Sequence, residues 1–167
     1  FGIAALVLSC EGPQGPPGFD GLDGLDGLDA PIPQVFEEVV TFVYEAENNI
    51  WRSEVLTYEG TVNGDIFQVF ISFDPGFFTP LPASVFDEFG EFQYVFDHDV
   101  NTVELQIIGD SDLSGLDAAS TNNIPIRVAI IPAELRSEFV GLETMDFQTM
   151  MSNLNLDNSD IQSISRQ

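Results

Sequence analysis

The residues best placed to bind a cation lie in the acidic stretch DSDLSG, residues 110–115. Carboxylates at its first and third positions, a hydroxyl at the fifth and glycine at the sixth match the first half of a calcium-binding loop. The twelfth position is Thr121 rather than glutamate, so the second half does not match. The candidate calcium ligands are Asp110, Asp112, Ser114 and Asp117. The alternative interpretation is an ordinary polar turn.

Acid–base and nucleophilic chemistry have few candidates. His98 is the only histidine, and it lies in an expected turn between two strands, so we interpret it as a surface residue. The sequence contains no His-Glu-x-x-His and no Gly-x-Ser-x-Gly, and a chain without lysine cannot form a Walker loop. With 28 acidic residues, neighbouring carboxylates are expected by chance. We therefore expect no enzymatic activity, with a hydrolase as the remote alternative.

Cys10 is the only cysteine, and its context indicates lipid attachment. Residues 1–9, FGIAALVLS, are apolar, end in a small residue and are too short to span a membrane, as in the last part of a secretory signal. VLSC, residues 7–10, resembles the bacterial lipobox, in which cleavage precedes the cysteine and its thiol carries diacylglycerol. Each buried acyl CH2 contributes about 0.8 kcal/mol to membrane binding. We expect a truncated lipoprotein signal peptide at 1–9 and a lipid anchor on Cys10.

Six Gly-X-Y triplets occupy residues 12–29, directly after this cysteine. A collagen triple helix requires glycine at every third position, so one interpretation of this tract is a homotrimeric stalk. Proline, however, occurs only in the first two triplets, and four triplets place aspartate in the same register, where three chains would repel one another. The preferred interpretation is an extended tether, about 56 Å long at about 3.1 Å per residue.

The net charge of -24 restricts the partners of the protein. Phosphate binding requires clustered lysine and arginine, and the chain has only four such residues, which argues against nucleic acid and against anionic head groups. Divalent cations and cationic partners are favoured, although many exported proteins simply carry an acidic, well-solvated surface.

From residue 35 onward, apolar and polar residues alternate with the period of two that is typical of strands. The predicted strands are 35–44, 66–73, 91–97, 101–108 and 124–131. Turn residues separate them, with no amphipathic helix in between, which predicts an antiparallel β-sandwich of jelly-roll or immunoglobulin-like type. We expect most of the 15 phenylalanines to lie in its core.

Near the C-terminus the period changes to that of a helix. Phe147, Met150, Met151 and Leu154 share one helical face, with Thr144 or Asp146 at its start. Shorter helical turns are expected from Pro132 and from Asp157 or Asn158, the latter carrying Ile161 and Ile164. The methionines are predicted to fill core space.

One apolar segment, FDPGFFTPLP at 73–82, lacks clear alternation. Phe77 and Phe78 are its candidate recognition residues, and the alternative is a loop folded over an open end of the sandwich. Trp51 is predicted to pack in the core rather than to stack on a sugar.

These blocks together resemble a family of collagen-like lipoproteins from bacteroidete-type Gram-negative bacteria. The resemblance rests on SCEGP at 9–13, Leu81-Pro82, GEFQYVFDHDVNTVELQI at 90–107, IRVAIIPAEL at 126–135 and NLNLDNSDIQ at 153–162. It implies a lipobox cysteine, a short Gly-X-Y tract and a C-terminal β-rich domain.

The sequence therefore predicts three parts: residues 1–9 as signal peptide, 10–30 as lipidated cysteine and tether, and 31–167 as an all-β sandwich with one or two short C-terminal helices. We expect a protein on the outer membrane or cell surface with a structural or binding role. A calcium-dependent or carbohydrate-binding adhesion module is the alternative. The expected partners are the membrane, through the lipid, and a protein or glycan.

Overall fold

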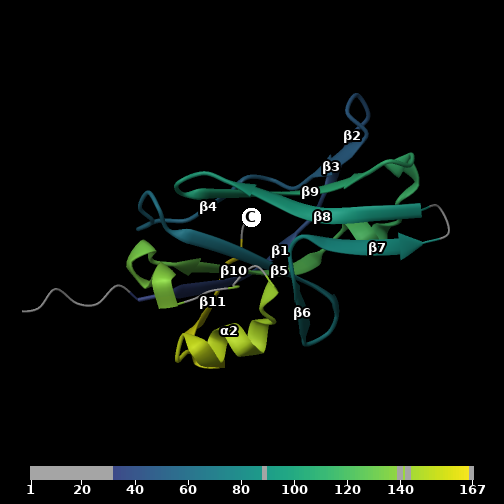
Figure 1. Ribbon diagram of the computed structural model, residues 1–167. Helices are drawn as coiled ribbons and strands as arrows, with labels where there is room; N and C mark the ends of the chain where they lie inside the picture. Colours follow the sequence, from purple (N-terminus) through teal and green to yellow (C-terminus); the bar gives the residue numbers. More distant parts are fainter. Residues whose placement is uncertain (1–31, 88–89, 139–140, 142–143, 166–167) are drawn as a thin grey trace, which may run out of the picture. The chain divides into compact units, whose positions relative to one another are not determined.

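The computed structural model describes residues 32–87, 90–138, 141 and 144–165, all within one compact unit, Pro31–Gln167. The predicted signal peptide, Cys10 and the Gly-X-Y tract lie outside the described residues. Two sheets of mainly antiparallel strands pack face to face (Figure 1), so the predicted all-β sandwich is confirmed.

The first sheet has the strand order β11-β1-β10-β5-β6. Its strands are β1 (Gln34–Val40), β5 (Ile66–Asp74), β6 (Phe77–Pro80), β10 (Ile124–Ile131) and β11 (Ile161–Ser163). Neighbouring strands are antiparallel, except that β11 pairs in parallel with β1. Pro75 and Gly76, whose φ is 87°, form the tight turn between β5 and β6, which requires a positive φ at its second central residue.

The second sheet has the order β2-β3-β9-β8-β7, and β4 also pairs with β9. Its strands are β2 (Val43–Glu45), β3 (Ile50–Arg52), β4 (Leu56–Thr57), β7 (Ala83–Asp87), β8 (Gly90–His98) and β9 (Thr102–Gly109). All of these pairings are antiparallel.

The main core lies between the two sheets, where alternate residues of the long strands meet. Val69 and Ile71 of β5 and Val103, Leu105 and Ile107 of β9 are completely buried there. Burial of such side chains stabilises a domain by about 1.5–3 kcal/mol each relative to exposure. This alternation is the same one that the sequence displays.

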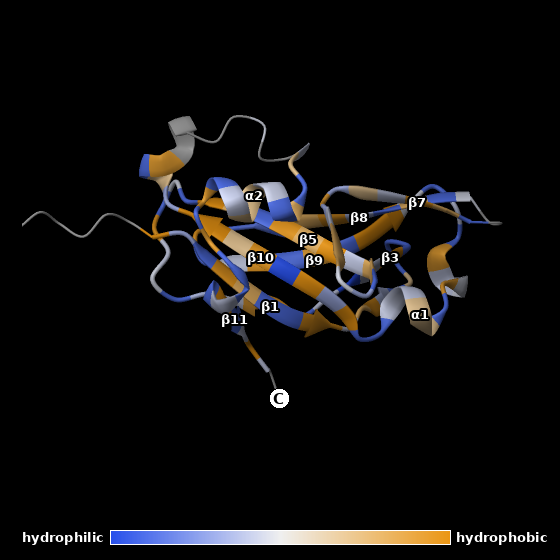
Figure 2. Cartoon of the chain, turned by 90° about the horizontal axis from the view of Figure 1, so that it is seen from below, coloured by the Kyte–Doolittle hydropathy of each residue, from blue (hydrophilic) through white to orange (hydrophobic). Residues whose placement is uncertain are grey.

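A second core lies on the opposite face of the first sheet, beneath helix α2 (Phe147–Asn153), as Figures 1 and 2 show. Phe147, Met150 and Met151 of the helix pack here, together with Phe70 of β5 and Ile131 of β10. The predicted helical face and the role of the methionines are therefore confirmed. Because both faces of the first sheet are covered, β5 is buried almost without interruption.

Most of the described phenylalanines lie in the two cores or pack against them, as expected, but three are exposed. Among the described residues, the buried ones are Phe36, Phe42, Phe67, Phe70, Phe92 and Phe147. Phe73, Phe77 and Phe86 are exposed by 47%, 76% and 75%. The last two lie on β6 and β7, strands at the edges of the two sheets, where no neighbouring strand covers one side.

Several element boundaries also differ from the prediction. The single strand expected at 35–44 is two strands, because the chain passes from one sheet to the other at Thr41 and Phe42. The segment 73–82 contains the strand β6 rather than only a loop. Asp157 starts a single turn, η4 (Asn158–Asp160), and Ile161 then begins β11 instead of continuing a helix. The turn after Pro132 is present as η2 (Ala133–Glu138).

Candidate functional site

The four predicted calcium ligands lie in the segment that follows β9, and two of them start helical turns. Asp112 is the N-cap of η1 (Leu113–Gly115) and accepts a 2.9 Å hydrogen bond from the backbone nitrogen of Ser114. Asp117 is the N-cap of α1 (Ala118–Thr121) and accepts a 2.9 Å bond from that of Ser120. The bonds from Ser114 lower the pKa of Asp112. Within the described residues, no group of three or more acidic, histidine or cysteine side chains is arranged to hold a metal ion.

The two candidate recognition phenylalanines point to opposite faces of β6. Phe77 is 76% exposed, whereas Phe78 is half-buried beneath α2. The Phe78 ring centroid lies 4.0 Å from the guanidinium carbon of Arg127 and 5.7 Å from the ring centroid of Phe147. Phe78 therefore holds the helix to the sheet, and only Phe77 is accessible to a partner.

The side chains of His98 and Trp51 both contact other residues of the domain. His98 is exposed at the end of β8, and its ring stacks on Phe67 with centroids 4.9 Å apart. Trp51 is half-buried against the main core, and its indole nitrogen donates a 2.8 Å hydrogen bond to the backbone oxygen of Leu113. Trp51 thus connects β3 to the loop that follows β9, as a core tryptophan would.

One surface groove, of about 730 Å³, runs along β2 and β3; we call it the Arg52 groove. Val39 and Val43 on its rim are exposed by 58% and 71%. Its charged residues are Arg52 with Glu45, Glu54 and Glu104. The groove therefore combines an apolar rim with an excess of negative charge.

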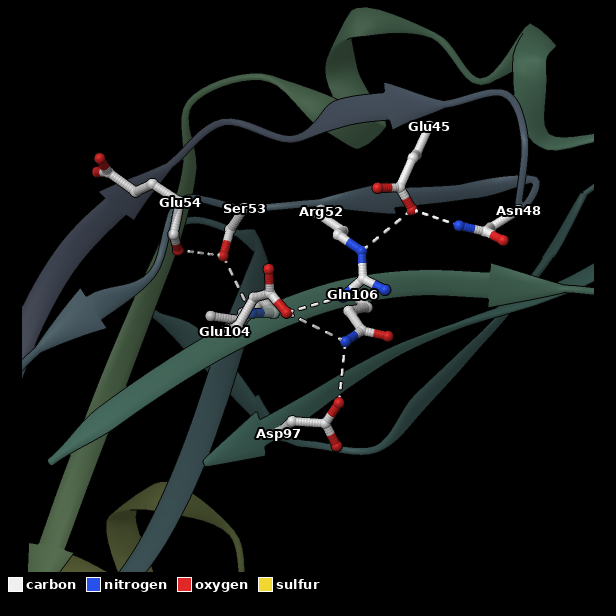
Figure 3. Close-up of polar contacts among 9 residues, drawn as sticks. Glu45, Asn48, Arg52, Ser53, Glu54, Asp97, Glu104 and Gln106 are labelled. Carbon is white, nitrogen blue, oxygen red and sulfur yellow. Dashed lines mark hydrogen bonds and ion pairs between the residues drawn. The ribbon is translucent and has the colours of Figure 1, made fainter. Parts of the chain in front are cut away.

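The polar side chains of the Arg52 groove are largely paired with one another (Figure 3). Arg52 donates from Nε to Glu45 Oε2 at 3.2 Å and from Nη1 to Glu104 Oε2 at 2.8 Å. Asn48 also donates to Glu45, and this bond and the bond from Arg52 lower the pKa of Glu45. Gln106 donates to both Glu104 and Asp97, which extends the network onto β8. This arrangement fixes the side chains and leaves the guanidinium charge compensated.

A second groove, of about 530 Å³, lies where β5, β7 and β8 meet the turn before β10; we call it the Phe73 groove. None of the described residues that line it is charged. Two are aromatic, four are hydroxyl or amide residues, and the rest are small or apolar. The aromatic and polar residues are Phe73, Tyr94, Ser72, Ser120, Asn122 and Asn123.

Tyr94 forms the floor of the Phe73 groove. Its side chain is 1% exposed, and its hydroxyl donates a 2.7 Å hydrogen bond to the backbone oxygen of Ser120. Burial raises the pKa of Tyr94 to about 12, so the hydroxyl stays protonated at neutral pH. The ring of Phe73 packs on Tyr94 with centroids 5.1 Å apart.

Sequence reasoning did not predict either groove. The Phe73 groove is built from residues 72–73, 85, 94, 119–120 and 122–125, which are brought together only by the packing of the two sheets. The one local signal is the pair Asn122-Asn123, which is typical of a turn and by itself indicates nothing more.

The fold places the chain among all-β sandwich domains. No protein-family model, curated protein or solved structure matches the chain. Among the described residues, no helix has the length and apolar character needed to cross a bilayer.

Proposed function

We propose that this protein is an exported, lipid-anchored binding protein. In this proposal Cys10 attaches it to the outer membrane or cell surface, the Gly-X-Y tract separates the domain from the bilayer, and the β-sandwich binds a partner without catalysis. The lipobox-like VLSC and the glycine repeat directly after it support the anchor and the spacer.

The observation that carries the binding role is that the Arg52 groove and the Phe73 groove share Asn123. Asn123 lies in the turn before β10 with φ of 55°, a conformation that asparagine tolerates better than most residues. Its backbone nitrogen donates a 3.1 Å hydrogen bond to Thr41 Oγ1. Two concave surfaces thus meet at a turn that a rigid sandwich holds in place, which is typical of binding sites.

The carboxylates around the grooves favour binding over catalysis. Of the three glutamates in the Arg52 groove, Glu45 and Glu104 are ion-paired with Arg52, whereas Glu54 forms no ion pair within the described residues. Asp117 caps a helix. A general acid or base must present an oxygen to its substrate, and most carboxylates around the grooves already have structural roles, which supports a domain that recognises a ligand and does not transform it.

The lipid anchor can be tested by expressing the chain with a complete signal peptide in a Gram-negative host supplied with labelled palmitate. We expect the wild type to incorporate the label and to partition into detergent, because the Cys10 thiol would carry the acyl chains. The Cys10→Ser variant should neither incorporate the label nor partition into detergent. Ser9→Ala keeps a small residue before the cysteine and should still be labelled. An unlabelled wild type, or a labelled Cys10→Ser variant, would contradict the proposal.

A further inference from the structure

We propose that the Phe73 groove binds a neutral saccharide, which stacks on the ring of Phe73 and is hydrogen-bonded by the side chains of Asn122 and Asn123. The proposal names a ligand class for the binding role proposed above and rests on that role. It concerns the groove without charged residues, and not the Arg52 groove.

The first argument is the absence of charge in this groove. The chain carries 28 acidic residues, yet among the residues that the structure describes no charged side chain lines the Phe73 groove. Asp117, the acid whose charge acts on Tyr94, accepts a bond from the backbone nitrogen of Ser120 and does not line the groove. A charged ligand placed here would lose hydration without gaining a partner, whereas a neutral polar ligand would not.

The second argument is the position of Phe73. Its ring is 47% exposed, and it packs on the buried ring of Tyr94, which is itself fixed by the bond to Ser120. The aromatic surface is therefore held in place before any ligand arrives, which reduces the entropy lost on binding. The C–H groups on one face of a pyranose ring are apolar and can pack on such a surface.

The third argument is the pair of amides beside this ring. Asn122 and Asn123 are both exposed, and Asn122 Oδ1 accepts only a long 3.4 Å bond from Thr121. Within the described part of the chain, Asn122 Nδ2 and the whole side-chain amide of Asn123 have no hydrogen-bond partner. An amide offers a donor and an acceptor side by side, which matches adjacent hydroxyls of a sugar.

The size of the groove agrees with this ligand. About 530 Å³ lies within the range of about 300–1,000 Å³ that is typical of small-molecule sites. The lining is mostly apolar by area, as is typical of small-molecule sites, and its amides and hydroxyls are the polar groups that can orient a ligand.

The test uses the full chain carrying Cys10→Ser and a set of neutral oligosaccharides: glucose-, xylose-, mannose- and N-acetylglucosamine-based. We expect at least one of them to bind, by titration calorimetry, and Phe73→Ala to weaken that binding by about tenfold or more. Phe73→Trp should retain binding because it preserves the aromatic surface. Asn122→Ala combined with Asn123→Gly should also weaken binding, because both side-chain amides are removed. Glycine replaces Asn123 because it accepts the positive φ at this position. Phe77→Ala is the matched control, because Phe77 is an exposed phenylalanine of the same hairpin outside the groove.

The outcomes separate the possibilities. Binding that is lost in Phe73→Ala, kept in Phe73→Trp and Phe77→Ala, and insensitive to salt supports the proposal. No binding of any of these saccharides at millimolar concentration overturns it, as does binding that Phe73→Ala leaves unchanged. Binding of an apolar peptide at Phe73 in place of a saccharide also overturns it. None of these results affects palmitate labelling of Cys10, so failure here is distinguishable from failure of the proposed anchor.

Discussion

At the scale of single residues, two arginines show how differently a scarce cation can be used. Arg127 of β10 is ion-paired with Glu37, with 2.6 Å between Arg127 Nη2 and Glu37 Oε2. Its guanidinium carbon also lies 4.0 Å and 4.5 Å from the ring centroids of Phe78 and Phe147. Arg52 instead bridges two glutamates, at 3.2 Å and 2.8 Å, and its side chain is 36% exposed against 15% for Arg127. Arg127 thus differs from Arg52 in its contacts with two aromatic rings and in its greater burial.

We expect Arg127→Ala to lower the free energy of unfolding by about 2 kcal/mol, because it removes an ion pair together with contacts to two aromatic rings. Arg127→Lys should recover only part of this loss, since an ammonium group lacks the planar surface of guanidinium. Urea denaturation of both variants measures the effect. Arg52→Ala is the control and should leave stability nearly unchanged. Equal losses at Arg52 and Arg127 would contradict this explanation.

At the scale of elements, aspartates repeatedly start the short helices. Asp112, Asp117, Asp146 and Asp157 each accept a hydrogen bond from a backbone nitrogen two or three residues later, at Ser114, Ser120, Thr149 and Ser159. The stretch that resembles half of a calcium loop is thus one of four such helix starts among the described residues. An Asp-x-Ser or Asp-x-x-Ser/Thr pattern predicts a helix start at least as well as it predicts a metal ligand.

Asp146 provides a test of this device at the helix that covers the first sheet. Bonds from the side chain and the backbone nitrogen of Thr149 lower the pKa of Asp146. A lowered pKa in the folded state means that the stabilisation is present above the unfolded-state pKa and is lost as the pH falls through the folded-state pKa. We expect Asp146→Ala to lower the melting temperature by a few degrees at neutral pH, with the difference from wild type disappearing in acid.

Differential scanning calorimetry across this pH range gives the measurement. Asp146→Asn should melt close to the wild type at neutral pH, because asparagine caps helices as well as aspartate does. A difference between wild type and Asp146→Ala that grows as the pH falls would refute the capping explanation.

The long elements could be predicted from the sequence because their signals are local. The apolar alternation of β5, β8, β9 and β10 and the helical face of α2 were all recognisable. The strands β3, β4, β7 and β11 have two to five residues and are stabilised by partners far away in the chain, as in the pairing of Leu56 with Val103. Such short strands contain too few residues to display a period. The division of 35–44 into two strands likewise depends on which sheet each half joins.

At the scale of the whole molecule, net charge opposes compactness. Only four basic residues face 28 acidic ones, so attraction between opposite charges cannot balance repulsion among the carboxylates. The hydrophobic cores on both faces of the first sheet must therefore stabilise the domain against this repulsion.

We expect sodium chloride to raise the melting temperature at neutral pH. Between about 0.01 and 0.15 M salt the screening length falls from about 30 Å to about 8 Å, which weakens repulsion among distant carboxylates. Thermal melting in sodium, magnesium and calcium chloride at equal ionic strength is the measurement. A melting temperature that falls with salt would contradict the expectation. A rise specific to calcium would instead support a site at Asp110, Asp112, Ser114 and Asp117.

The grooves belong to this scale too, which is why they escaped prediction. Phe73, Tyr94 and Asn123 come from three separate segments, and nothing in the sequence near any of them indicates the other two. Phe73 and Tyr94 lie in the strands that the sequence predicts at 66–73 and 91–97, and both strands are present. The local sequence pattern does not determine the lateral position of one sheet over the other, and this position brings the three residues together.

The parallel pairing of β11 with β1 gives the domain a mechanical property. β1 is the first described strand, and it is hydrogen-bonded along both edges, to β10 over seven residue pairs and to β11 over three. A pull along the strand through its N-terminal end must therefore shear both registers at once, rather than open them one bond at a time. Shear across many simultaneous hydrogen bonds resists force far better than sequential opening. A domain held at this end would keep its two sheets folded under flow or tension.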